Sequence, residues 1–174
     1  MTREEFIEVL DNEGYSHEIS GDKLIVRKDP MPNGEHNRLT VYSIPSDVIF
    51  EDCGNLSIPF ISSIPKGIEF RNTGSLVFLR LETISPDVKF NNNGSIWMEK
   101  IETLPSGLVF NNKEGIYLDV IKFIPDSVVF NNKGGLYVNP YKRRFKNWKV
   151  NNEGIEGIDD LKLFRHLVKQ GMFI

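Results

Sequence analysis

The sequence contains a single cysteine, Cys53, and only three histidines, His17, His36 and His166, among its 174 residues. One cysteine cannot form an intramolecular disulfide, and it cannot supply the paired thiolates of a cysteine-rich metal site. The histidines are widely separated, and none has a second Cys, His, Asp or Glu at the spacing of metal ligands. We therefore expect no metal and no cofactor, and we expect a reducing compartment.

The sequence also lacks a continuous apolar stretch of roughly 18 residues, the minimum for a membrane helix. Its first residues, Met-Thr-Arg-Glu-Glu, have neither the basic start nor the apolar stretch of a signal peptide. We expect no membrane association and a cytoplasmic location. Apolar residues nevertheless make up 40% of the chain, which is enough to bury a continuous core in one domain.

Net charge is small, at −3, but the charges are unevenly distributed. Residues 1–20 carry six acidic side chains against Arg3 alone, whereas residues 127–152 carry six basic side chains and no acid. Such asymmetry fits either an interaction surface or two solvated ends of the molecule.

An internal repeat of 20 residues dominates the sequence. Five consecutive units start at Ile44 without an insertion or deletion, and each opens on an aliphatic residue followed by proline, directly or after one residue. A repeat of this length predicts a solenoid of stacked units. The main apolar registers are Phe50, Phe70, Phe90, Phe110 and Phe130; Leu56, Leu76, Ile96, Ile116 and Leu136; and Ile58, Phe78, Met98, Leu118 and Val138.

Each unit is predicted to carry two short strands. Apolar positions fall two apart twice, as in Val88 and Phe90 and again in Ile96 and Met98, which is the period of a strand with one buried face. A turn rich in Asn and Gly separates the strands, and Pro fixes the other corner. One register of this turn is predicted to stack into a structural ladder that satisfies backbone groups: Asp52, Asn72, Asn92, Asn112, Asn132 and Asn152.

The ends of a solenoid expose core and strand edges, so we expect a cap at each end. At the N-terminus, Thr2 and Glu5 have the spacing of a capping box before an amphipathic helix that ends near Gly14. A strand over 23–28 and a loop over 29–37 follow. The N-terminal cap is therefore predicted to combine a helix with strands.

The predicted domain organisation has three parts within one structural domain. Residues 1–43 form the N-terminal cap, residues 44–143 form the five repeats, and residues 144–174 close the other end. In this last part Val150 falls 20 residues after Phe130, which predicts a degenerate sixth coil, and an amphipathic helix follows. The predicted fold is an all-β solenoid of 20-residue coils, with two short strands per coil, an N-terminal helix-strand cap and a C-terminal helical cap.

Large aromatic side chains recur at the outward position of the second strand, where the five units have Ser57, Val77, Trp97, Tyr117 and Tyr137. One interpretation is stabilisation of the sheet by cross-strand pairs, or cover by a cap or a second copy of the chain. The other is a binding face, because aromatic residues dominate interface hot spots. The candidate partner-binding residues are Val77, Leu79, Trp97, Glu99, Tyr117, Asp119, Tyr137 and Asn139.

A basic stretch with interleaved aromatics follows the last repeat. This composition is typical of a nucleic-acid or phosphate-binding patch. The alternative is a loop in which the aromatics are buried and the cations solvated, and the net negative charge of the chain favours that alternative. The candidate anion-binding residues are Lys142, Arg143, Arg144, Lys146 and Lys149.

No arrangement of nucleophile and base is apparent. Cys53 stands at a turn position that other units fill with Thr73, Asn93, Lys113 and Lys133, so we interpret it as a turn residue and not as a catalytic thiol. We expect that the protein is not an enzyme.

The pattern Ile-Pro-x-x-Val-x-Phe-x-Asn-x-Gly-x-Leu-x-Leu resembles leucine-rich-repeat-like proteins, and the period resembles the short repeats of bacterial effector proteins. The order Leu-x-x-Leu-x-Leu-x-x-Asn of ordinary leucine-rich repeats is absent. The chain is more similar to small, mostly uncharacterised solenoid proteins of bacteriophage genomes. This likeness covers nearly the whole chain and includes residues 5–10, Gly14-Tyr15, residues 21–24, the repeats, Asn147-Trp148 and Gly157-Ile158.

The resemblance implies a phage protein without catalytic activity that binds and blocks a host protein in the bacterial cytoplasm. Inhibition of an antibacteriophage defence system is the specific hypothesis that it favours. Two alternatives stay open from the residues: nucleic-acid or nucleotide binding through the basic stretch at 142–149, and a structural role through self-association as a homo-oligomer.

Overall fold

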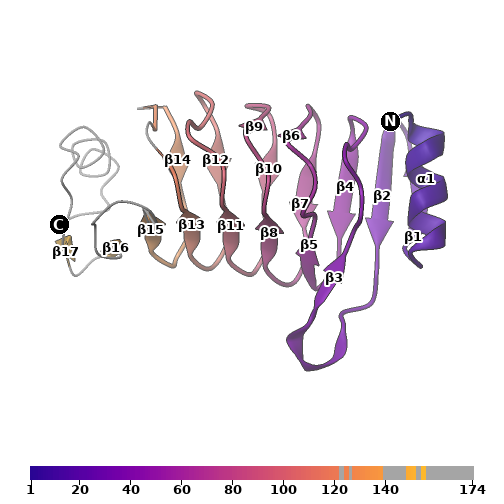
Figure 1. Ribbon diagram of the computed structural model, residues 1–174, viewed down its shortest axis with the longest axis horizontal. Helices are drawn as coiled ribbons and strands as arrows, with labels where there is room; N and C mark the ends of the chain where they lie inside the picture. The colour runs from indigo at the N-terminus through magenta and orange to yellow at the C-terminus, as the bar shows by residue number, and fades with distance from the viewer. Residues whose placement is uncertain (122–123, 126, 139–147, 152–153, 156–174) are drawn as a thin grey trace.

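The structure is a computed structural model that describes residues 1–121, 124–125, 127–138, 148–151 and 154–155. These residues are mostly β, with one α-helix, and stack as a β-solenoid of about six turns. In Figure 1 the helix α1 lies at one end of the stack and the coils follow one another along the long axis.

A first sheet runs along one side of the solenoid in the order β1-β2-β4-β7-β10-β12-β14. From β2 onwards the strands pair in parallel, and from β4 onwards each pair is offset by one repeat, so that Phe50 lies opposite Phe70. The repeat in the sequence therefore becomes the register of the sheet. The strands are β1 Ser16–Ser20, β2 Lys23–Arg27, β4 Val48–Glu51, β7 Glu69–Arg71, β10 Lys89–Phe90, β12 Val109–Phe110 and β14 Val129–Phe130.

A second sheet covers the other side, in the order β17-β16-β15-β13-β11-β8-β5-β3. Its strands pair in parallel from β3 to β15. Each repeat thus gives one strand to each sheet, as the alternation of apolar residues predicted. The strands are β3 His36–Arg38, β5 Asn55–Ser57, β8 Leu76–Phe78, β11 Ile96–Met98, β13 Ile116–Leu118, β15 Leu136–Val138, β16 Trp148–Asn151 and β17 Gly154–Ile155.

A third sheet, of two short strands, lies between the first two sheets in the chain order of two coils. There β6 (Ser63–Ile64) pairs in parallel with β9 (Thr83–Ile84). The apolar alternation did not predict these strands, because each has only two residues and one buried side chain.

The core between the sheets is a column of phenylalanines. Successive rings of Phe50, Phe70, Phe90, Phe110 and Phe130 have centroids 5.3, 5.4, 5.0 and 5.3 Å apart, and neighbouring planes lie within 15° of parallel. All five side chains are buried. Because strand stacking repeats at about 4.8 Å, the rings can continue from coil to coil and join the apolar layers into one core.

The N-terminal helix α1 (Arg3–Asn12) begins with the predicted capping box. The Glu5 N–H donates to Thr2 Oγ1 at 3.2 Å, and the Thr2 N–H donates to the Glu5 carboxylate at 2.7 Å. Phe6 and Leu10 belong to the buried core, and the helix packs beside β1 at the end of the stack, so it covers the end of the core. After the helix, Gly14 has a φ of +71°, a conformation that favours glycine.

The segment before Ile44 contains more structure than the sequence predicted. The strand β1, which is polar and largely exposed, pairs antiparallel with β2. The strands β2 and β3 form an additional coil, because Val26 lies opposite Phe50 and Asn37 lies opposite Leu56. The prediction of a loop over 29–37 is therefore wrong at its C-terminal end, because β3 starts at His36. The loop also contains the 3₁₀ helix η1 (Pro32–Gly34).

The predicted sixth coil is not borne out in its described strands. A further coil would place Val150 beside Phe130 in the first sheet, but β16 runs antiparallel to β15 and places Val150 opposite Leu136 in the second sheet. The strand β17 then pairs antiparallel with β16. The predicted C-terminal helix lies outside the described residues.

The asparagine ladder forms over most of its predicted length. Asn72, Asn92 and Asn112 are buried, and each Nδ2 donates to backbone carbonyl groups of its own turn and of the preceding turn. For example, Asn92 Nδ2 lies 2.8 Å from the Gly94 oxygen and 3.3 Å from the Gly74 oxygen. The amides therefore add a side-chain donor to carbonyl groups of the turns, of which the Gly54 and Gly74 oxygens also accept a backbone N–H from the next coil.

Asp52 does not join this ladder. Its φ is +53° and its side chain is exposed. The next residue, Cys53, is buried instead, with its Sγ 3.5 Å from the Val26 carbonyl oxygen, while Asn37 Nδ2 donates to the Cys53 carbonyl at 2.8 Å. Cys53 lies between β4 and β5, at the predicted turn, and its side chain is buried there. Asn152 lies outside the described residues.

Candidate binding surface

Three aromatic side chains form a stacked column on the outer face of the second sheet. The strands β11, β13 and β15 pair Trp97 with Tyr117 and Tyr117 with Tyr137. The ring centroids lie 3.8 Å and 4.4 Å apart, and the planes are within 5° of parallel. Met98 and Leu118 point inward and are buried, so the alternation of the strand places the aromatics outward as predicted. We call Trp97, Tyr117 and Tyr137 the aromatic column.

The column is rigid because its rings cover one another. Tyr117 has a ring against each face, which leaves its edge for contact with solvent, whereas Trp97 has an aromatic neighbour on one face only and is 41% exposed. Gly115 lies close beneath the rings, since a Cβ there would be 2.8 Å from Cε2 of Tyr137. The same geometry stabilises the sheet and presents a firm, half-exposed edge.

The other predicted surface residues flank this column. Val77 precedes Trp97 in the same register and is half-buried, and Leu79 is 37% exposed. Glu99 is exposed. The pKa of the Asp119 carboxyl is raised, mainly because Asp119 is partly buried and also because the charge of Glu99 lies nearby. The acidic side of the column thus carries two carboxylates that repel each other. Asn139 lies outside the described residues.

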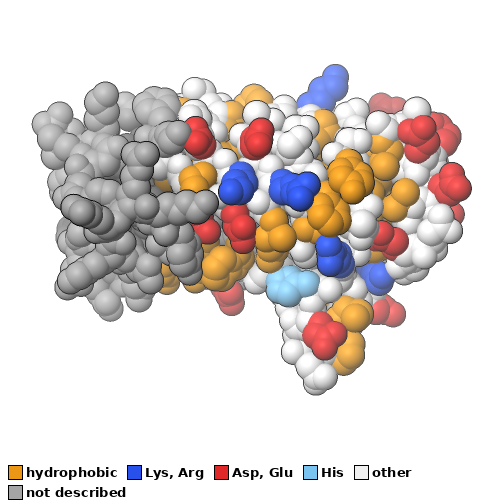
Figure 2. Space-filling view, in the orientation of Figure 1, with side chains coloured by type: hydrophobic (Ala, Val, Ile, Leu, Met, Phe, Trp, Pro, Cys, Tyr) orange, Lys and Arg blue, Asp and Glu red, His pale blue; other side chains and the backbone are white. Residues whose placement is uncertain are grey.

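A second aromatic pair extends the surface toward the N-terminal end, and the sequence analysis missed it. Tyr42 is 72% exposed and stacks on Phe60, with centroids 5.5 Å apart. The guanidinium carbons of Arg38 and Arg80 lie 5.3 and 5.4 Å from the Phe60 ring centroid. Figure 2 shows hydrophobic side chains in an irregular band across this region of the molecule, with Lys and Arg side chains on both sides of it.

In the sequence, the sign of this aromatic pair is a break in the repeat. Phe60 stands where the next three units have Arg80, Lys100 and Val120, so an aromatic residue there departs from the pattern. Tyr42 lies in the linker before the first repeat and has no aromatic counterpart in its own register, which is why stepping by 20 residues did not find the pair.

Four of the candidate anion-binding residues lie outside the described residues: Lys142, Arg143, Arg144 and Lys146. Only the backbone of Lys149 is described: it lies in β16 opposite Tyr137. Nucleic-acid binding through this stretch stays a prediction.

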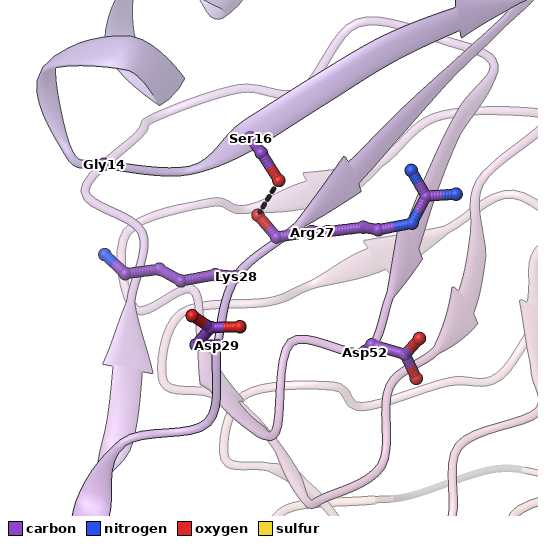
Figure 3. Close-up of a pocket in the computed structure, with 6 residues that line it drawn as sticks. All are labelled: Gly14, Ser16, Arg27, Lys28, Asp29 and Asp52. Atoms are coloured by element: carbon purple, nitrogen blue, oxygen red, sulfur yellow. Dashed lines mark hydrogen bonds between the residues drawn. The ribbon is translucent and has the colours of Figure 1, made fainter.

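One polar recess of about 380 Å³ lies beside the N-terminal hairpin (Figure 3). Its two cations are already engaged: Arg27 pairs with Glu18 and Glu51, and Lys28 donates to the backbone of the helix end and lies over the Tyr15 ring. The remaining lining residues are Gly14, Ser16, Asp29 and Asp52. The Ser16 hydroxyl donates to the Arg27 carbonyl at 3.3 Å, so this recess lacks an activated nucleophile.

Burial raises the pKa of the Cys53 thiol to about 12, and the charge of Asp52 adds to this effect. A thiol held in this state is a poor nucleophile at neutral pH. Among the described residues there is no cluster of three or more His, Cys, Asp or Glu side chains arranged to hold a metal ion. Within the same part of the chain, no helix has the length and apolar character needed to cross a membrane.

Comparison of the chain with protein-family models, with curated proteins and with solved structures found no match. The likeness to solenoid proteins of bacteriophages therefore stays a prediction.

Proposed function

We propose that the protein is a non-enzymatic protein-binding module that uses the outer face of its second sheet. The observation that carries this proposal is the aromatic column, three parallel rings of Trp97, Tyr117 and Tyr137 on consecutive strands. Rings held in this way lose little conformational entropy when a partner docks on them. Trp and Tyr are also the residues most often found at energetic hot spots of interfaces.

The position of the column supports a role beyond the core. Inward-facing neighbours such as Met98 and Leu118 already fill the interior, and the same outward register holds the smaller Ser57 and Val77 in the preceding coils. Trp97 stacks on Tyr117 and still leaves 41% of its side chain open to a partner. The exposed Leu79 and Tyr42 enlarge the apolar area into a patch of the kind found at interaction sites.

The biological setting that we propose follows the resemblance stated above. A leucine-rich-repeat-like solenoid encoded by a phage would use this face to bind and block a host protein in the bacterial cytoplasm, with a defence complex as the specific hypothesis. The support for this setting is the likeness in sequence alone, and the fold contributes the surface but not the partner.

The test is affinity capture from bacterial lysate with the wild-type chain and with the triple variant Trp97→Ser, Tyr117→Ser, Tyr137→Ser. We expect the triple variant to stay folded by circular dichroism and to lose the captured protein. A matched control replaces Asn91, Asn111 and Asn131 by Ser, since these also form an exposed row on three consecutive coils. A folded triple variant that captures the same protein would show that the column only stabilises the sheet.

A further inference from the structure

The two arginines of the first sheet, Arg27 and Arg71, both pair with carboxylates of the same chain. Arg27 Nη2 lies 2.6 Å from a carboxylate oxygen of Glu51, and Arg71 Nε lies 2.8 Å from one of Glu69. These pairs occupy N–H donors of both guanidinium groups and leave them little capacity for an outside anion.

Two arginines on the other face differ from this pattern. The side chains of Arg38 and Arg80 make no ion pair or hydrogen bond with any described residue, and both are exposed. Their one shared neighbour is Phe60, whose ring lies within 5.4 Å of both guanidinium carbons. An aromatic ring restricts the position of a guanidinium group but occupies few of its N–H donors.

These residues, together with Tyr42 on the Phe60 ring, form a cluster that we call the arginine-aromatic cluster: Arg38, Tyr42, Phe60 and Arg80. It carries two positive charges, held over an aromatic ring, whose donors point to no acceptor in the described chain. A carboxylate is the ligand that matches such donors, because it can accept two N–H groups of one guanidinium at once.

One member of the cluster, Arg38, lies in line with the aromatic column across the second sheet. Arg38 lies opposite Ser57, Ser57 opposite Val77, and Val77 opposite Trp97. The two residues between Arg38 and Trp97 are Ser57 and Val77, so the second face of the Trp97 ring has no aromatic neighbour. An extended peptide that lies along the solenoid axis would meet two arginines first and then the Trp97 ring.

We infer that this surface binds a peptide segment that carries carboxylates next to an aromatic or branched aliphatic side chain. The carboxylates pair with Arg38 and Arg80, and the apolar side chain covers Leu79 and the exposed part of Trp97. This inference rests on the proposed function and specifies the chemistry of the partner. A long polyanion such as a nucleic acid fits less well, because Glu99 and Asp119 lie farther along the same face and repel it.

The test is selection of a random peptide library on the immobilised full chain, followed by affinity measurements with the enriched peptides. We expect enrichment of Asp and Glu together with Trp, Tyr, Phe or Leu. The double variant Arg38→Gln, Arg80→Gln should weaken these peptides by about tenfold per arginine, since hydrogen bonds to charged groups are worth about one order of magnitude or more in affinity. The matched control Arg71→Gln removes an arginine of the first sheet and should change affinity less than about twofold.

Several results would overturn the inference. The inference is wrong if the enriched peptides lack acidic residues, or if they bind the double variant as tightly as the wild type. It is also wrong if the wild type enriches no peptides beyond those that the double variant enriches. A single-stranded oligonucleotide that displaces the peptides and loses its own binding in the double variant would overturn it as well. Loss of lysate capture in the aromatic triple variant with full capture by the arginine double variant would leave the proposed function standing and remove only the inference.

Discussion

Trp97 and Tyr117 lie face to face across β11 and β13, with ring centroids 3.8 Å apart and planes 4° from parallel. The phenylalanines of the core are spaced more widely, at 5.0 to 5.4 Å. Since parallel strands repeat at about 4.8 Å, the two outer rings must lean toward each other. Their contact is therefore made by the side chains themselves and is not imposed by the spacing of the backbone.

Replacement of Gly115 by Ala is expected to disturb this contact without entering the core. A Cβ at this position would lie 2.8 Å from Cε2 of Tyr137 and 3.2 Å from Cε2 of Tyr117, so both rings must shift. We expect a changed near-ultraviolet circular dichroism spectrum and a loss of about 1 to 3 kcal/mol in unfolding free energy, as for other overpacked sites. The control is Ser95→Ala, at the same register one coil earlier. An unchanged spectrum in Gly115→Ala would contradict the described ring positions.

Replacement of Phe90 by Ala is expected to lower the free energy of unfolding by about 3 to 5 kcal/mol. The ring is fully buried and stacks on Phe70 on one side and on Phe110 on the other, so its removal leaves a cavity between two layers. Urea denaturation measures the loss. Lys89→Ala, on the exposed side of the same strand, is the control and should stay within about 0.5 kcal/mol of the wild type. A similar small loss in Phe90→Ala would contradict a continuous phenylalanine core.

The core was predictable because it repeats. Phe90 recurs every 20 residues with a strand-like apolar neighbour two residues away, and that pattern alone defines the buried face, the two strands and the order of the coils. Trp97 was predictable for the same reason, since the alternation that buries Met98 places its neighbour outward. Repetition thus gives both the core and the aromatic column.

Features that do not repeat were not predictable from the period. The additional coil at the N-terminal end has Val26 opposite Phe50, 24 residues away, and a long loop before β3, so stepping by 20 residues does not detect it. The pairing of Tyr42 with Phe60 joins different registers and depends on side-chain directions in space. Val150 matched the repeat by spacing, but its strand β16 pairs antiparallel with β15, which spacing alone cannot exclude.

The asparagine ladder predicts different losses of stability for substitutions at two adjacent residues. Asn92→Ala removes a buried amide that donates to the Gly74 and Gly94 carbonyl groups. The Gly74 oxygen keeps a 2.8 Å bond from Asn72 Nδ2, whereas the Gly94 oxygen keeps a longer contact of 3.5 Å from Asn112 Nδ2. We expect a loss of about 1 to 3 kcal/mol in the free energy of unfolding. Asn93→Ala changes the next, exposed side chain of the same turn and should cost little. Equal effects of the two variants would show that the ladder does not stabilise the turns.

Cys53 is expected to make the protein less stable as the pH rises above 9. Burial raises the pKa of the thiol from 9.0 to about 12 in the folded state, so between these values the unfolded chain releases a proton that the folded chain retains. The stabilising effect is fully present below the unfolded pKa of 9.0 and is lost as pH rises through the folded value, with a limiting slope of about 1.4 kcal/mol per pH unit.

The measurement compares urea denaturation of the wild type and of Cys53→Ala between pH 8 and pH 10. The buried Tyr15 hydroxyl contributes least to the pH dependence in this range, because its ordinary pKa is 10.0 and burial raises that pKa further. We expect the difference in unfolding free energy between the two proteins to shrink as the pH rises. Folded wild type should also resist alkylation by iodoacetamide at pH 8 and react after denaturation, because only the thiolate is a good nucleophile. Rapid alkylation of the folded chain, or a difference that does not change with pH, would contradict the buried position of Cys53 beside the Val26 carbonyl.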